Sequence, residues 1–139
     1  MGKKLSLLLL AMLFVISGCS SDSGSSVSAG DVITKFKEAG LEAEDARALT
    51  SEDMGIAPMA FEEGQRFVLP SLGEDVGARV FVFKKTSDLD DLKKYYDEMG
   101  KASAMFFSHT YAKDKVLLQL PGKLEEEQVN KYKEVMDKL

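Results

Sequence analysis

Residues 78–100 read ARVFVFKKTSDLDDLKKYYDEMG, and this stretch decides the fold class of the chain. Its first seven residues are apolar at successive positions in their middle, which is typical of a central strand with both faces covered. A helical pattern follows, in which apolar side chains recur at intervals of three and four: Leu89, Leu92, Tyr96 and Met99. Ser87 is the predicted N-cap of this helix, and Gly100 its predicted end.

More strands and helices are expected on both sides of this stretch. The other predicted strands are 66–69, 104–111 and 116–120, the last two joined by a hairpin at 112–115. The other predicted helices are 31–39, 124–138 and a short one within 44–49. The fold class is therefore α+β, with the order α-β-β-α-β-β-α and a four-stranded, mainly antiparallel sheet carrying helices on one face. A parallel pairing of 78–84 with 104–111 is an alternative, and the strand order stays open.

Local signals mark three helix ends. Ser28 followed by Asp31 is a variant capping box for the first helix. Gly40 can adopt the left-handed conformation that ends this helix. Thr50 is expected to cap a turn further along the chain.

Residues 1–18 have the pattern of a secretory signal. Lys3 and Lys4 precede the almost wholly apolar residues 5–16. As a helix this run would span about 18 Å, too short for a hydrocarbon core of about 30 Å. Ile16-Ser17-Gly18-Cys19 follows directly, with an aliphatic residue three before a cysteine and small residues between. These four positions resemble the lipobox of bacterial lipoproteins.

The resemblance implies a processing route and a location. A signal peptidase would cut before Cys19, whose thiol carries a diacylglycerol, with fatty acids such as palmitate holding the chain on the extracytoplasmic face of the cell membrane. Each buried CH₂ contributes about 0.8 kcal/mol, so two acyl chains anchor stably where one does not. Residues 19–30, rich in serine and glycine, are then a tether. Residues 31–139 are a single α+β domain, which resembles small uncharacterised lipoproteins of Gram-positive bacteria in size and lysine-rich acidic composition.

Charge and residue usage exclude several classes of function. Without residues 1–18, 16 basic side chains face 23 acidic ones, a net charge of about −7 that argues against nucleic acid as a partner. Cys19 is the only cysteine, which excludes an intrachain disulfide and a cysteine-based zinc site. His109 is the only histidine, so a multi-histidine metal site is excluded too. We expect no metal and no cofactor.

The sequence offers no clear catalytic group. Ser108 and His109 are neighbours on an expected strand, so their side chains point to opposite faces and cannot pair. Ser71, in the loop after 66–69, is the remaining partner for His109. A hydrolase built on these two residues is therefore one functional hypothesis. We expect that the protein is not an enzyme.

Residues 54–61, MGIAPMAF, are apolar without periodicity. Such a segment either covers the edge of the core or is displayed for a partner. The candidate binding surface comprises Met54, Ile56, Met59, Phe61 and Tyr111. The leading hypothesis is a non-enzymatic protein-interaction domain that contacts another envelope protein. The alternative is a small-ligand binder with a pocket between sheet and helices near Met59, Phe61 and Tyr111.

Overall fold

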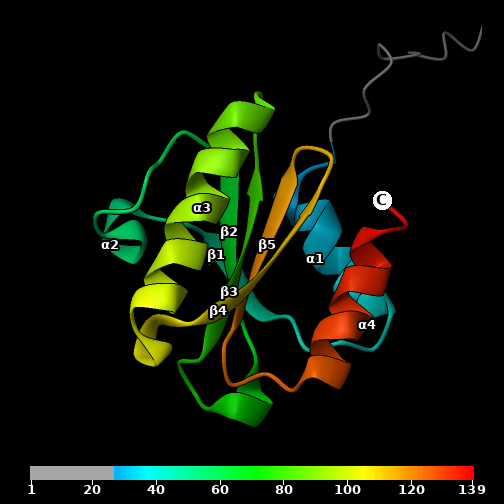
Figure 1. Ribbon diagram of the computed structural model, residues 1–139. Coiled ribbons are helices and arrows are strands. Elements are labelled where there is room, and N and C mark those ends of the chain that lie inside the picture. The colour runs from blue at the N-terminus through cyan, green and yellow to red at the C-terminus, as the bar shows by residue number, and fades with distance from the viewer. Residues whose placement is uncertain (1–26) are drawn as a thin grey trace, which may run out of the picture.

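The computed structural model describes residues 27–139, so the predicted signal peptide, the lipobox and Cys19 lie outside the described part. Within it, one five-stranded antiparallel sheet lies between helices on both faces (Figure 1). The α+β class is confirmed. The predictions of four strands, of one covered face and of the order α-β-β-α-β-β-α are wrong.

The strands of the sheet are β1 (Glu44–Ala48), β2 (Glu63–Val68), β3 (Gly77–Val82), β4 (Ser108–Lys113) and β5 (Val116–Pro121). Their spatial order is β1-β2-β3-β5-β4, and all neighbours are antiparallel. β3 lies at the centre, as its two-sided apolar sequence predicts. Because β5 inserts between β3 and β4, these two strands do not pair, and the parallel alternative is wrong.

β1 lies where the sequence predicts a short helix. All five of its residues are exposed, so no apolar alternation marks it as a strand. Its pairing with β2 shifts register between Glu44 and Arg47, and Asp45 has a φ of 48°. β1 is therefore a bulged edge strand that its neighbour holds in place.

The helices are α1 (Ala29–Glu38), α2 (Ser51–Met54), α3 (Thr86–Ala102) and α4 (Glu126–Met136). α1 and α4 pack on one face of the sheet, and α3 with α2 packs on the other. Alternate residues of the central strands serve the two cores. Val80 and Leu118 face α1 and α4, whereas Phe81 and Leu117 face α3, and all four are fully buried.

Two predicted N-caps are confirmed. The Ser28 hydroxyl accepts from the Asp31 amide at 3.0 Å, and the Asp31 carboxylate accepts from the Ser28 amide at 3.2 Å. Thr50 and Asp53 form the same reciprocal pair at α2. Gly40 has a φ of 77° after α1, as expected. α1 begins at Ala29, so the last two residues assigned to the tether belong to this helix.

Both predicted ends of the middle helix are wrong. α3 begins at Thr86, and Lys85 rather than Ser87 precedes it without a side-chain cap. It continues through Gly100 to Ala102, because the absent side chain of Gly100 leaves room for Phe107. A 3-10 turn, η2 (Ala104–Phe106), then occupies residues expected in a strand, and β4 starts only at Ser108.

The two ends of the sheet differ in what surrounds them (Figure 1). At the upper end, Val27, the β4–β5 turn and Leu139 come together around one hollow. At the lower end, β4 begins at Ser108 and β5 ends at Pro121. The six residues of β4 separate these ends by about 17 Å. The chain therefore enters the domain at the end opposite η2.

Candidate functional site

All three arginines of the chain lie in one row across neighbouring strands. Arg47 on β1 is paired with Arg66 on β2, and Arg66 with Arg79 on β3. The row continues to Gln119 on β5 and Thr110 on β4. Paired residues of an antiparallel sheet point to the same face, with Cβ atoms about 5 Å apart. Three positive charges therefore start from adjacent positions of one face.

This row faces α3, since Arg79 alternates with residues that point into the opposite core. We call Arg66, Arg79, Gln119, Thr110 and Ser108 the arginine surface. Its first four members are only partly buried, whereas Ser108 is 9% exposed. Nearer the upper end, the same face carries fully buried apolar side chains instead. The α3 face is thus part core and part polar surface.

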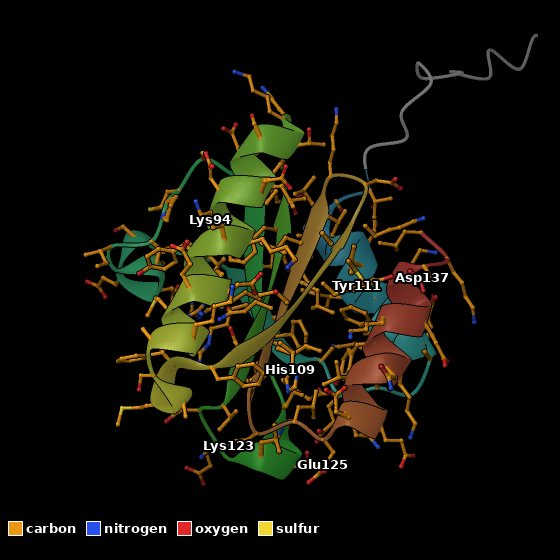
Figure 2. All side chains as sticks on the ribbon, viewed as in Figure 1. Lys94, His109, Tyr111, Lys123, Glu125 and Asp137 are labelled. Atoms are coloured by element: carbon orange, nitrogen blue, oxygen red, sulfur yellow. The ribbon has the colours of Figure 1, made fainter. Side chains whose placement is uncertain are left out.

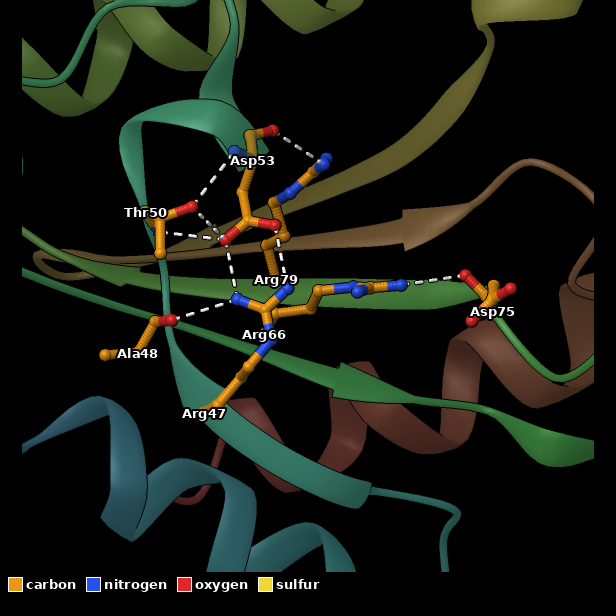
Figure 3. Close-up of polar contacts among 7 residues, drawn as sticks. All are labelled: Arg47, Ala48, Thr50, Asp53, Arg66, Asp75 and Arg79. Atoms are coloured by element: carbon orange, nitrogen blue, oxygen red, sulfur yellow. Dashed lines mark hydrogen bonds and ion pairs between the residues drawn. The ribbon is translucent and has the colours of Figure 1, made fainter.

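Arg47 and Asp53 form the one ion pair of the row (Figure 3). The two Nη atoms of Arg47 donate to the two carboxylate oxygens of Asp53 at 2.6 and 2.8 Å. The Thr50 amide donates to the same carboxylate at 2.8 Å. The Arg47 hydrogen bonds, followed by that of the Thr50 amide, hold the pKa of Asp53 well below its usual range. Asp53 therefore fixes α2 beside β1.

Arg66 and Arg79 donate only to neutral acceptors. Arg66 reaches the carbonyl oxygen of Asp75 at 2.8 Å, and Arg79 reaches the Asp53 carbonyl oxygen at 3.1 Å (Figure 3). Arg79 also donates to Gln119 Oε1 at 2.8 Å. Within residues 27–139, neither has a carboxylate oxygen within 4.0 Å. A guanidinium has five N–H donors, so both retain unused ones. Two positive charges on this surface lack a counter-ion in the described chain.

Two buried polar atoms of the arginine surface lack a hydrogen-bond partner among the described residues: Arg79 Nε and Ser108 Oγ. Leaving such a group unsatisfied costs about 1–3 kcal/mol. A third such atom, His109 Nε2, lies on the opposite face of the sheet, so unpaired buried atoms are not confined to the arginine surface.

On the α3 side of the arginine surface, one carboxylate already has an ion-pair partner. Asp97 accepts from Lys93 Nζ and from Thr110 Oγ1, each at 2.6 Å. Burial raises the pKa of Asp97, but these two hydrogen bonds outweigh it and lower the pKa overall. Burial raises the pKa of the neighbouring Tyr96, and the charge of Arg79 opposes that change. Asp97 is therefore paired with Lys93 and Thr110 and forms no ion pair with Arg66 or Arg79.

The predicted 54–61 segment divides between core and surface. Met54 is 5% exposed, and Phe61 packs on Phe81 with ring centroids 5.2 Å apart, so these two residues cover the α3-side core. Ile56 and Met59 are 92% and 48% exposed. Met54 and Phe61 thus cover the core, whereas Ile56 and Met59 lie at the surface.

Tyr111 lies on the opposite face of the sheet. Its hydroxyl donates to Asp137 beyond α4, and Lys133 Nζ lies 5.6 Å from its ring centroid (Figure 2). The five candidate residues therefore do not form one surface. A pocket framed by Met59, Phe61 and Tyr111 is not formed, because the sheet separates the last of them from the other two.

Hollows of the described chain lie elsewhere. One of about 520 Å³ is at the upper end between Val27, the β4–β5 turn and Leu139. Another of about 370 Å³ lies beside Glu42, Ser71 and Tyr132. None of the five candidate residues lines either hollow.

Ser71 and His109 do not pair. Ser71 Oγ donates to Glu42 Oε2 at 2.5 Å. His109 points to the side of β4 that faces α4, and its ring lies edge-on to Phe107 at 4.9 Å (Figure 2). The described residues also contain no group of three His, Cys, Asp or Glu side chains placed to hold a metal ion.

Sequence reasoning missed an exposed apolar turn at the lower end, residues 105–107. Met105 is 85% exposed, Phe106 54% and Phe107 48%. An ideal Cβ on Gly122 would lie 2.3 Å from the carbonyl oxygen of Phe107, so the absence of a side chain there lets the turn pack closely. Phe107 anchors the turn, and Met105 and Phe106 project from it.

Comparisons of this chain with protein-family models, with curated proteins and with solved structures find no match. None of the helices within residues 27–139 has the length and apolarity needed to cross a membrane.

Proposed function

We propose that this chain is a lipid-anchored protein of the extracytoplasmic membrane face whose domain binds another envelope protein without catalysing a reaction. The anchor is argued from Ile16-Ser17-Gly18-Cys19 directly after the apolar run. Binding is argued from the arginine surface, where two positive charges lack a carboxylate partner in the described chain. That surface is the observation on which the binding role depends.

The exposed side chains favour a protein as partner. Interfaces between proteins are enriched in Arg, Met and aromatic residues. Arg66 lies on the arginine surface, and Met105 and Phe106 are exposed at the lower end of the sheet. The acidic net charge disfavours nucleic acid.

The anchor would keep this binding close to the membrane. Seven residues lie between Cys19 and Val27, so the two are eight positions apart. A fully extended chain of that length reaches at most about 29 Å. The tether enters at the upper end, so the lower end can turn towards partners beside the membrane.

Metabolic labelling with an alkyne analogue of palmitate tests the anchor. We expect the chain to be labelled and to partition into the membrane fraction, and the Cys19→Ser variant to be unlabelled. An unlabelled wild-type chain contradicts the anchor. Crosslinking in intact cells followed by affinity purification tests the binding role, and recovery of no specific envelope protein contradicts it.

A second candidate function, binding of a small ligand, is favoured by the hollow of about 520 Å³ at the upper end. Small-molecule sites fall within about 300–1,000 Å³ and are largely apolar. Val82, Phe83 and Val116 supply apolar walls here. A thermal-shift screen of the purified chain with fatty acids tests it: a ligand-dependent rise in Tm that Val116→Lys removes supports this function, and no rise contradicts it.

A further inference from the structure

We infer that the arginine surface is where the partner binds, and that the partner contributes an acidic segment whose aspartate or glutamate carboxylates reach Arg66 and Arg79. The inference rests on the proposed protein-binding function and specifies its surface and the chemistry of its partner. It depends on the charge, register and hydrogen bonding of residues in β2, β3, β4 and β5.

The first argument is the repulsion built into the row. Like charges directly opposite each other on neighbouring strands destabilise a sheet. Arg47, Arg66 and Arg79 make two such pairs. Only the positive charge of Arg47, at the edge of the sheet, is balanced by a carboxylate, that of Asp53. In a chain with more acids than bases, two uncompensated arginines side by side indicate a surface that an external anion completes.

The second argument is the unused hydrogen-bonding capacity. Arg66 uses one donor in the described chain and Arg79 uses two. A carboxylate accepts several N–H and O–H donors at once, and charge-assisted bonds of this kind are about twice as strong as neutral ones.

The third argument is the carboxylate that the domain already binds. Asp53 is gripped by both Nη atoms of Arg47 at one end of the row. This contact shows the planar, two-bond geometry in which a guanidinium recognises a carboxylate. Arg66, the next member of the row, lacks the equivalent acid within residues 27–139. A partner carboxylate would repeat at Arg66 what Asp53 does at Arg47.

The charge of the whole domain selects a short acidic segment over a long polyanion. The chain has a net charge of −5, so an extended polyanion is repelled outside the arginine surface. Met105 and Phe106 are exposed at the lower end of the domain and offer an apolar contact in addition to the charged one. The expected partner segment therefore carries one or two acidic side chains beside apolar ones.

A peptide array tests the inference with defined probes. The full chain, purified in a non-ionic detergent, is incubated with ten-residue synthetic peptides of varied composition, and the affinity of the tightest binder is measured by fluorescence anisotropy. We expect the bound peptides to be enriched in Asp or Glu beside apolar residues. Arg66→Gln should weaken the tightest binder by about tenfold or more, because charge-assisted hydrogen bonds to a guanidinium are lost.

Lys94→Gln is the matched control, because it removes the same charge from the outer side of α3, where Lys94 is 72% exposed (Figure 2). This variant should bind within about twofold of the wild type, as expected for a charge outside the contact. Arg66→Gln leaves the contacts of Arg79 intact, so it keeps the test valid if Arg79→Gln fails to fold. Selection of neutral or basic peptides, or equal affinity of Arg66→Gln and wild type, overturns the inference. Citrate that binds as tightly as the best peptide also overturns it, because the surface would then take small anions.

Failure of this inference is distinguishable from failure of the proposed function. A cellular partner that crosslinks equally to wild type and Arg66→Gln leaves protein binding intact but places it elsewhere on the domain. An unlabelled Cys19 removes the anchor and leaves the peptide result unaffected.

Discussion

The two faces of the sheet differ in how completely apolar side chains cover them. On the face under α1 and α4, Phe67, Leu69, Val80 and Leu118 are all fully buried and apolar. On the α3 face, a buried apolar half gives way to the arginine surface, where like charges lie opposite each other on neighbouring strands. The first face is composed of core residues that stabilise the fold. The second face also carries polar and charged side chains that the core does not need and that can bind a partner. Substitutions on the two faces should therefore separate stability from binding.

The largest expected difference is between Leu118 and Gln119, neighbours on β5 that point to opposite faces. Leu118→Ala should lower the free energy of unfolding by about 2–5 kcal/mol, because it leaves a cavity in the α1/α4 core. Gln119→Ala should cost about 1.5 kcal/mol, the lower end of the range for a hydrogen bond to a charged group, here Arg79. Urea unfolding measures both, and equal losses would show that the two faces contribute alike.

Gly122→Ala should have the next largest effect. An added Cβ would lie 2.3 Å from the backbone oxygen of Phe107, so the apolar turn must shift. Such overpacking costs about 1–3 kcal/mol. Gly30→Ala is the control, since the nearest atom to its ideal Cβ is 3.5 Å away. Thermal unfolding of the two variants compares them, and an unchanged Tm for Gly122→Ala would mean that the turn yields freely.

Asp53→Asn should lower the free energy of unfolding by about 1 kcal/mol at neutral pH, because it removes the charged partner of Arg47. The folded-state pKa of Asp53 lies below its ordinary value of 3.8, so its stabilisation is present above that pH and is lost as the pH falls below it. The difference between wild type and variant should therefore shrink below about pH 4. Urea unfolding at a series of pH values tests this, with the exposed Glu52→Gln as control. A difference that stays constant down to pH 2 would contradict it.

The smallest expected effect on stability is that of Arg66→Gln. The substitution loses one hydrogen bond to the Asp75 carbonyl oxygen but relieves two like-charge pairs, so stability should change by no more than about 0.5 kcal/mol. Its effect on peptide affinity should nevertheless be the largest of the set. A loss of more than about 2 kcal/mol in the free energy of unfolding would show that Arg66 mainly stabilises the fold.

Sequence reasoning succeeded where the pattern was apolar and periodic. The central position of β3, the hairpin between β4 and β5, and the burial of Leu89, Leu92 and Tyr96 follow directly from it. The two-sided apolar pattern of ARVFVFK also implied helices on both faces, a consequence that the prediction of one covered face overlooked.

The rest depended on contacts distant in sequence. β1 has the composition of a helix and no apolar alternation, and only pairing with β2 makes it a strand. The arginine row was not predictable, because the spacings between Arg47, Arg66 and Arg79 differ and only the register aligns them. The one available signal was the rarity of arginine among the 18 basic residues.

The irregular edge strand β1 disfavours sheet pairing between copies of this domain. A flat, open strand edge invites another chain to continue the sheet, which is how aggregation begins. The left-handed backbone at Asp45 and the shifted register after Glu44 interrupt the row of amide and carbonyl groups that such growth would need. Pairing of two copies through β1 is thus disfavoured, and recognition at this edge of the sheet is left to side chains.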